Sequence, residues 1–269
     1  MRRLSWFNLT TLTFGFAFLY LPMLVLVGYS FNSNKLVTVW AGFSTRWYGE
    51  LFRNEAMIDA AWVTLRIALA SSTLATVLGT MAAYVLVRGG RFFGRTLFSG
   101  MLYAPLVMPD VILGLSLLLL FIAIGMDRGI LTIVLAHTTF SMAYVAVVVA
   151  ARLVAFDRSL EEAALDLGCT RFGAFRLVTL PIIAPAVISG WLLGFTLSLD
   201  DLVIASFTSG PASTTLPIKV FSAVRLGVNP EINALSAILI GIVSVGVIAA
   251  SLMSKRAILR ARAEEARAG

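Results

Sequence analysis

Cysteine and histidine are almost absent from this chain of 269 residues, which has one of each, Cys169 and His137. A single cysteine excludes a disulfide within the chain and a cysteine metal cluster. One histidine leaves a histidine metal centre equally unsupported. The sequence therefore indicates neither thiol nor metal chemistry, and we interpret Cys169 as a residue at a junction between two short helices.

Charged residues are also scarce, at 13% of the chain, where soluble domains average about 25%. Hydrophobic residues make up 59%, and the mean hydropathy is +0.93. A globular core cannot bury this much apolar surface, so the excess faces lipid. Six apolar runs reach the length of about 20 residues that crosses a hydrocarbon core. They lie near 11–31, 61–87, 97–124, 130–152, 182–207 and 233–253.

The composition thus predicts an all-α membrane protein, a single domain over 1–269 with six transmembrane helices. The first run is longer than the core of a signal peptide, about 7–15 residues, and no A-x-A-like site follows it, so we expect a retained helix. In the second run and the fifth, small residues recur every four positions, a pattern that lets helix backbones approach closely in lipid. The two ridges are Ser71, Ala75, Gly79 and Ala83, and Ala186, Gly190 and Gly194.

Lysine and arginine set the predicted orientation. Most of the 21 basic residues gather at the two chain ends, between the second and third runs, and between the fourth and fifth. The positive-inside rule then places both termini and the segment 159–181 in the cytosol. The net charge of +7 matches anionic headgroups. Because no basic patch is interleaved with stacking aromatics, we expect no nucleic-acid partner.

The segment 159–181 is a polar island between the fourth and fifth runs, with the sequence SLEEAALDLGCTRFGAFRLVTLP. Ser159-x-x-Glu162 is a capping-box pattern, which predicts a short helix beginning near Leu160. Gly168 is suited to end that helix in the left-handed conformation. Thr170 can cap a second short helix.

This segment resembles the EAA loop, the signature of permease subunits of ATP-binding-cassette importers. The match consists of Glu162-Ala163-Ala164, three residues, Gly168, nine residues, Val178, one residue and Leu180-Pro181, with only the usual isoleucine changed, to Val178. The resemblance implies the type I importer permease fold, with this loop as a cytosolic coupling helix seated on a separate ATPase. ATP and magnesium would bind that ATPase, and this chain would hold no cofactor and no catalytic residue. The residues expected at the ATPase are Glu162, Ala163, Ala164, Leu165, Gly168, Leu180 and Pro181.

Further stretches resemble the permeases of polyamine importers over essentially the whole chain, and are nearest to the second permease subunit of bacterial putrescine importers. The resemblance implies a bacterial inner-membrane heterodimer of two related permeases, two ATPase copies and a periplasmic polyamine-binding protein, working by alternating access. Spermidine or another cationic solute is an alternative substrate. The stretches are FNSNK at 31–35, FSTRWY at 43–48, PLVMPDVI at 105–112, SLDDLVIASF at 198–207 and GVNPEINA at 227–234.

Four ionisable side chains fall within the outer half of the predicted helices, when depth is counted at about 1.5 Å per residue. Such residues are costly in a membrane and usually face a cavity, a partner or a pathway. Three carboxylates at similar depth would attract a cation, and Tyr144 could add a cation–π contact. The candidate pathway residues are Asp110, Asp200, Asp201, His137 and Tyr144.

Each of these residues also has a structural interpretation. Asp110 can cap a helix restarted after Pro109, and His137 can be a hydrogen-bonded core residue. Asp200 and Asp201 can bond to nearby hydroxyls, and because adjacent carboxylates repel, we expect one in the pore and the other in a structural contact. Tyr144, Trp191 and Phe195 can equally face the core or lipid.

Gly89–Thr96 has the spacing of a phosphate-binding loop, with Arg95 in place of the lysine. A true phosphate loop joins a strand to a helix, so we interpret this one as a turn between two membrane helices. The loops 32–60 and 208–232 are candidates for the landing surface of a solute-binding protein. Two other classes stay open: a proton-coupled secondary transporter that uses the buried carboxylates, and a membrane assembly or sensory protein without a pathway.

Overall fold

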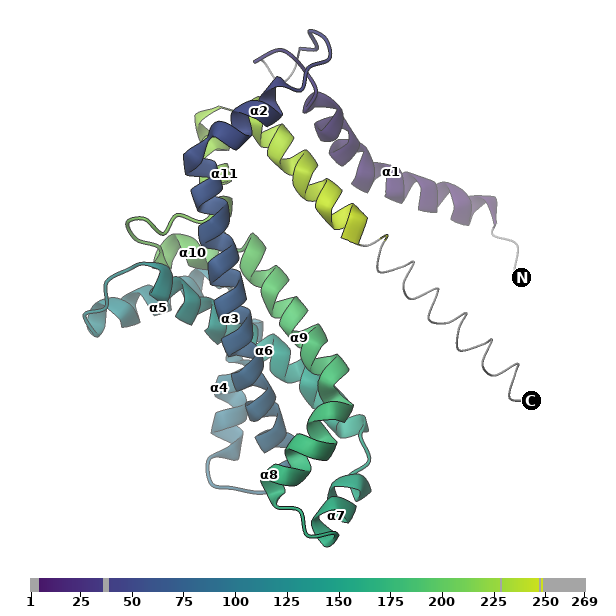
Figure 1. Cartoon of the computed structure of the whole chain (residues 1–269), viewed down its shortest axis with the longest axis vertical. Helices are drawn as coiled ribbons and strands as arrows, with labels where there is room; N and C mark the ends of the chain where they lie inside the picture. The colour runs from purple at the N-terminus through teal and green to yellow at the C-terminus, as the bar shows by residue number, and fades with distance from the viewer. Residues whose placement is uncertain (1–4, 36–38, 228, 247, 249–269) are drawn as a thin grey trace. The chain divides into compact units, whose positions relative to one another are not determined.

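Helices form nearly all the regular structure of the computed structural model, which describes residues 5–35, 39–227, 229–246 and 248 (Figure 1). Strand pairing in this part of the chain is limited to one isolated bridge, between Asn32 and Phe43. The all-α prediction is confirmed. In chain order the helices are α1 (Trp6–Tyr29), α2 (Arg46–Arg53), α3 (Glu55–Arg88), α4 (Arg95–Val107), α5 (Asp110–Ala123), α6 (Ile130–Ala155), α7 (Ser159–Asp166), α8 (Arg171–Ala174), the π-helical turn η1 (Phe175–Thr179), α9 (Leu180–Asp200), α10 (Val203–Thr208), α11 (Leu216–Leu226) and an apolar helix at Pro230–Gly246.

Four helical stretches are long and apolar enough to cross a membrane, namely α1, α3, α6 and the continuous stretch Arg171–Asp200. A bent pair, α4 with α5, makes a fifth if it is one span. Several membrane crossings are therefore confirmed, whereas the count of six is not. Where a sixth helix was predicted, at 233–253, Pro230–Gly246 is apolar but shorter than the spans above, and residues 247 and 249–253 lie outside the described residues.

The apolar run at 97–124 is not one helix, as predicted, but two. α4 ends at Val107, α5 begins at Asp110, and the chain bends by 120° between them. Met108 is extended, with ψ of 136°, because a residue that precedes proline clashes with the proline ring in the helical region. Pro109 also has no N–H with which to continue the helical hydrogen bonds. The break therefore results from the backbone chemistry of Met108 and Pro109, which the continuous hydrophobicity of the run does not indicate.

The run at 182–207 also divides, since α9 ends at Asp200 and α10 begins at Val203. Between them Asp201 is extended, with ψ of 121°. Its carboxylate accepts hydrogen bonds from the backbone N–H of Ile204, at 3.3 Å, and of Ala205, at 2.7 Å. Because the first N–H groups of a helix have no partner within it, a carboxylate placed there favours a new helix start.

The chain forms two units, residues 56–221 and residues 1–55 with 222–269. In unit 56–221, α3, α4, α6 and α9 share one core of small and branched side chains, with α9 packed along α6 (Figure 1). Its fully buried members include Ala75, Ala83, Val145, Val149 and Ile183.

The small-residue ridges of α3 and α9 meet helices of this same chain. A β-carbon at Gly79 of α3 would lie 2.8 Å from the carbonyl oxygen of Met142 and 2.9 Å from Cβ of Val145, both on α6. A β-carbon at Gly190 of α9 would lie 3.2 Å from Cγ1 of the same Val145. The glycines therefore let the backbones of α3 and α9 close on α6 from two directions, as packing in lipid requires.

Unit 1–55 with 222–269 contains α1, which buries none of its residues; a helix that is apolar on all sides is typical of a membrane span. The loop that follows is anchored by Trp47 of α2, whose Nε1–H donates to the carbonyl oxygen of Asn32 at 2.6 Å. The Asn54 amide donates to Glu231 at 2.9 Å and ties α2 to the last helix. Because Trp47 is only 2% exposed, it is not available as a landing contact for another protein.

Candidate functional site

The EAA-like segment folds as two short helices joined by a tight turn. α7 begins at Ser159 itself, and Oδ1 of Asp157 accepts from the Ser159 backbone N–H at 3.0 Å. Hydrogen bonds from the Ser159 backbone N–H and from the Ser159 hydroxyl lower the pKa of Asp157 below its usual value. The predicted capping box is therefore wrong: Asp157, two residues earlier, takes the role that we gave to the Ser159 hydroxyl.

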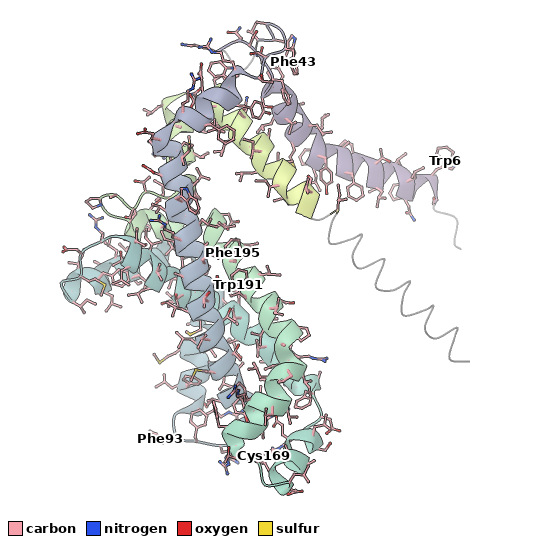
Figure 2. The ribbon with its side chains drawn as sticks, viewed as in Figure 1. Trp6, Phe43, Phe93, Cys169, Trp191 and Phe195 are labelled. Atoms are coloured by element: carbon pink, nitrogen blue, oxygen red, sulfur yellow. The ribbon has the colours of Figure 1, made fainter. Side chains whose placement is uncertain are left out.

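The predicted end of α7 is confirmed. Gly168 has φ of +90°, and its N–H donates to the Leu165 carbonyl, while the Cys169 N–H donates to the Ala164 carbonyl at 3.0 Å. This pair of bonds is the Schellman motif, which glycine favours at the left-handed position. Figure 2 shows Cys169 in this turn, and Thr170 then caps α8 by accepting from the Gly173 N–H at 3.0 Å.

The residues that we expect at an ATPase do not all face the same way. Glu162, Ala163, Leu165, Gly168 and Pro181 are exposed, and Glu162 forms an exposed ion pair with Arg158 at 3.1 Å. By contrast, Ala164 is buried against unit 56–221, and Leu180 packs on its core. The outward face also carries two large apolar side chains, Leu167 and Phe172, which are 87% and 73% exposed. The segment thus presents an apolar surface with charged residues of both signs around it.

One residue of this segment was missed by sequence reasoning. Glu161, next to Glu162, is buried, and its Oε2 lies 3.0 Å from Nε of Arg88 at the end of α3. Its Oε1 accepts from the Thr179 hydroxyl at 2.7 Å. Helical spacing was the available signal, because Glu161 and Ala164 are three residues apart and so share the buried face of α7.

The turn at Gly89–Thr96 joins α3 to α4, with Gly90 and Gly94 both at positive φ. The Arg95 guanidinium donates to the Leu86 carbonyl at 2.7 Å and to the Gly90 carbonyl at 3.1 Å. It therefore satisfies carbonyl groups at the C-terminal end of α3, where a cation is favoured. Phe93 of this turn and Cys169 lie at the same end of unit 56–221 (Figure 2).

The predicted pathway residues separate into a buried group and an exposed group. His137 of α6 is fully buried, with Nδ1 2.6 Å from the Ser198 hydroxyl and Nε2 3.1 Å from Oδ2 of Asp201. Ser71 of α3 donates to Ser198 at 3.1 Å. These contacts join α3, α6, α9 and the α9–α10 junction in one chain of polar side chains.

The direction of these hydrogen bonds follows from the donor inventory of each group. A carboxylate only accepts, so Nε2 of His137 carries the hydrogen toward Asp201. In the neutral ring Nδ1 then accepts from Ser198, whose oxygen accepts in turn from Ser71. Every member of this chain of side chains has a hydrogen-bond partner. The surroundings of His137 therefore agree with its structural interpretation as a hydrogen-bonded core residue.

Asp200 and Asp110 differ from this buried group. Asp200, the last residue of α9, is exposed. Asp201, by contrast, contacts His137 and accepts two hydrogen bonds from backbone N–H groups. Asp110 is exposed too, in the first turn of α5, where the helix dipole favours a carboxylate. Tyr144 of α6 is half-buried and packs on the cluster around Phe140. The structure therefore brings together His137 and Asp201, but not the whole predicted set.

Two further aromatic residues on α9 lie face to face (Figure 2). Trp191 and Phe195 stack with ring centroids 5.2 Å apart, and the Trp191 Nε1–H donates to the Thr73 hydroxyl of α3 at 3.2 Å. Because this bond holds the indole against α3, Trp191 has a structural contact of its own.

Comparison with known proteins places this architecture among transporters. The family model described as "binding-protein-dependent transport system inner membrane component" matches residues 75–263. The chain is 62% identical over 255 residues to the putrescine transport system permease protein PotI of Escherichia coli strain K12, covering 92% of this chain and 91% of that protein. It is 42% identical over 240 residues to the spermidine/putrescine transport system permease protein PotC of the same strain, covering 89% and 90%.

The fold is similar to one chain of a crystal structure of a bacterial ABC transporter involved in the import of the acidic polysaccharide alginate. The TM-score is 0.74 at 16% sequence identity, covering 92% of this chain and 94% of that one. At this identity the likeness concerns the fold alone, which is that of an ABC importer permease.

Proposed function

This chain belongs to the inner membrane components of binding-protein-dependent transport systems, and from that premise we propose that it is a permease subunit of an ATP-driven putrescine importer. It is a transport subunit and not an enzyme. The observation that carries the proposal is the near-full-length likeness to a putrescine permease. In the importer it forms half of the translocation pathway, and a second, related permease forms the other half.

The coupling surface is the exposed face of α7 and α8 together with the turn between them. Leu165, Leu167 and Phe172 offer apolar anchors, and the small Ala163 permits close approach, as in contacts in which a helix sits in a groove. The groove belongs to a cytosolic ATPase, present in two copies, which binds ATP and magnesium. The family supports this kind of partner.

The orientation that we propose places both termini and α7–α8 in the cytosol of a bacterial cell, with six crossings of the inner membrane. The positions of the α3–α4 and α7–α8 turns support it, since both turns lie at one end of unit 56–221 (Figure 2). Arg91 lies in the first turn, and Arg171 and Arg176 follow the second. Pro230–Gly246 provides the sixth crossing in this scheme. A periplasmic polyamine-binding protein then docks on the opposite side.

The substrate-facing carboxylate in this proposal is Asp200. α9 has an exposed face on which residues spaced by three or four positions, and so lying on one side of a helix, include Ser189, Thr196 and, at its end, Asp200. A diammonium substrate that enters from the periplasmic side and passes along this face meets the carboxylate first and then the hydroxyls. Asp201 is committed to His137 and to the start of α10, and serves as the structural neighbour.

Replacing Asp200 by Asn is expected to lower putrescine uptake per assembled complex by roughly tenfold to a hundredfold. A hydrogen bond to a charged group contributes about 1.5–3 kcal/mol, and about 1.4 kcal/mol is tenfold. Asp201→Asn should instead lower the yield of folded protein, because it weakens a buried pair. The measurement is uptake kinetics of labelled putrescine, normalised to purified complex. Unchanged uptake by the Asp200→Asn complex would remove Asp200 from the pathway.

Reconstitution tests the function as a whole. Proteoliposomes that contain this chain, its partner permease and the ATPase should accumulate labelled putrescine when binding protein and ATP are supplied. Competition with unlabelled spermidine compares the affinity of the importer for the two polyamines. Spermidine is the alternative substrate because the chain is also similar to a spermidine/putrescine permease. Uptake driven by a proton gradient without the ATPase would contradict the proposal.

A further inference from the structure

α7 is attached to the rest of the chain through a small contact. Of its eight residues only Glu161 and Ala164 are buried, whereas Leu160, Glu162 and Leu165 are exposed. Ala164 contributes a methyl group, so the polar contacts of the buried face are those of Glu161. Apart from its peptide connections and its packing on α8 and η1, α7 therefore contacts the membrane helices through this one carboxylate.

The first arm of the contact runs to α3 and α6. Nε of Arg88 lies 3.0 Å from Oε2 of Glu161, and both side chains are about nine-tenths buried. The same guanidinium donates to the carbonyl oxygens of Leu153, at 3.0 Å, and Phe156, at 3.2 Å, and stacks over the Phe156 ring. Arg88 thus connects Glu161 to the last turns of both α3 and α6.

The second arm runs to α9. Oε1 of Glu161 accepts from the buried Thr179 hydroxyl at 2.7 Å. Thr179 is the last residue of η1, a π-helical turn that continues directly into α9. π-Helical turns inside helices frequently mark functional sites. One carboxylate therefore contacts α3 and η1 directly, through its two oxygens, and α6 through Arg88.

We propose that Glu161, with Arg88 and Thr179, is the positioning group that transmits movement of the coupling helix to α3, α6 and α9. The inference rests on the proposed function, since it requires an ATPase that displaces α7. The two contacts depend on different properties of the carboxylate. Its negative charge attracts Arg88, and its oxygen lone pair accepts the hydrogen bond from Thr179. Loss of either arm should let α7 follow the ATPase without moving the membrane helices equally.

The test uses the complete importer in proteoliposomes, with Glu161→Gln and Thr179→Val as separate variants. Each retains side-chain size and removes one arm, the charge or the hydroxyl. The expected result is ATPase bound at the unaltered ratio and ATP hydrolysis largely retained, with putrescine imported per ATP reduced about fivefold or more, the lower range of allosteric coupling. The double variant should lose less putrescine import per ATP than the sum of the two single losses, when these are expressed as free energies, because both changes act on Glu161.

Asp127→Asn is the control, since Asp127 is an exposed carboxylate in the turn between α5 and α6, outside the coupling surface, the candidate pathway residues and the loops 32–60 and 208–232; its transport per ATP should not change. A proportional fall of uptake and hydrolysis, or an unchanged ratio in both variants, would overturn the inference. Failure of both variants to assemble would also overturn the inference, because Glu161, Arg88 and Thr179 would then have a structural role only. Failure of the proposed function is distinct, because then the unaltered chain would neither retain an ATPase nor import putrescine with ATP.

Discussion

Replacing Glu162 by Ala and Gly168 by Asp together is expected to abolish ATP-driven putrescine uptake while the protein still inserts into the membrane. Gly168 has φ of +90° and open space around its α-carbon, so the new side chain strains the backbone without a clash. That strain costs about 1–2 kcal/mol in an L-residue, enough to shift the α7–α8 turn but not the core. Replacing Glu162 removes one exposed carboxylate and its ion pair with Arg158 from the coupling surface. Uptake should fall by far more than tenfold.

The measurement combines putrescine uptake with co-purification of the ATPase from the same cells. A matched control is Asp127→Ala with Gly125→Asp, since Asp127 is also an exposed acidic residue, and Gly125 also has positive φ, +68°, with open space around it. The control should transport normally, because neither residue belongs to the coupling surface. Retained uptake with the ATPase bound in the test variant would contradict the coupling assignment.

The second large effect is expected in the membrane core, on replacing Gly79 by Leu. Its β-carbon alone would lie 2.8 Å from the Met142 carbonyl oxygen, a backbone atom of α6 that cannot rotate away. Overpacking costs about 1–3 kcal/mol, and here the larger side chain must also separate α3 from α6. We therefore expect little folded protein and a markedly lower melting temperature in detergent.

Gly100→Leu is the control for this change, because Gly100 lies within α4 and has nothing within 4 Å of a β-carbon. Its helix should be unaffected or slightly stabilised, since glycine costs a helix about 1 kcal/mol relative to better helix formers. The two variants are compared by thermal unfolding and by size-exclusion profile. Equal melting of both would show that the close approach at Gly79 is not a constraint.

The sequence was sufficient to predict the long helices but not where two of them break, nor the short helices α2 and α11, which lie in segments predicted as loops. Apolar length predicts a crossing, and all long apolar runs within the described residues are helical. The break at Pro109 and the one at Asp201 leave no mark on hydrophobicity, because each depends on a single residue's backbone chemistry. Asp157 took the capping role predicted for Ser159 for a related reason: Ser159 is itself the first residue of α7, so its own N–H needs an acceptor, and Asp157 supplies it.

Contacts between distant residues explain the rest of what sequence reasoning missed. Glu161 and Arg88 belong to different helices, and nothing in either segment indicates that they meet. The depth of His137 and Asp201 was predicted separately, whereas their pairing depends on how α6 packs beside α9. The expectation that adjacent aspartates divide their roles agrees with an exposed Asp200 and an engaged Asp201; their roles in transport stay predictions.

The close packing of α3 and α9 on either side of Val145 limits how this subunit can move. Densely packed interfaces are not continuously deformable, so α3, α6 and α9 can rotate or translate only as a single rigid body. Helical hydrogen bonding is interrupted at Met108–Pro109, at Asp201–Leu202 and around Gly168, among other connections. If the subunit works by alternating access, we expect it to pivot at such interruptions and not within the packed helices.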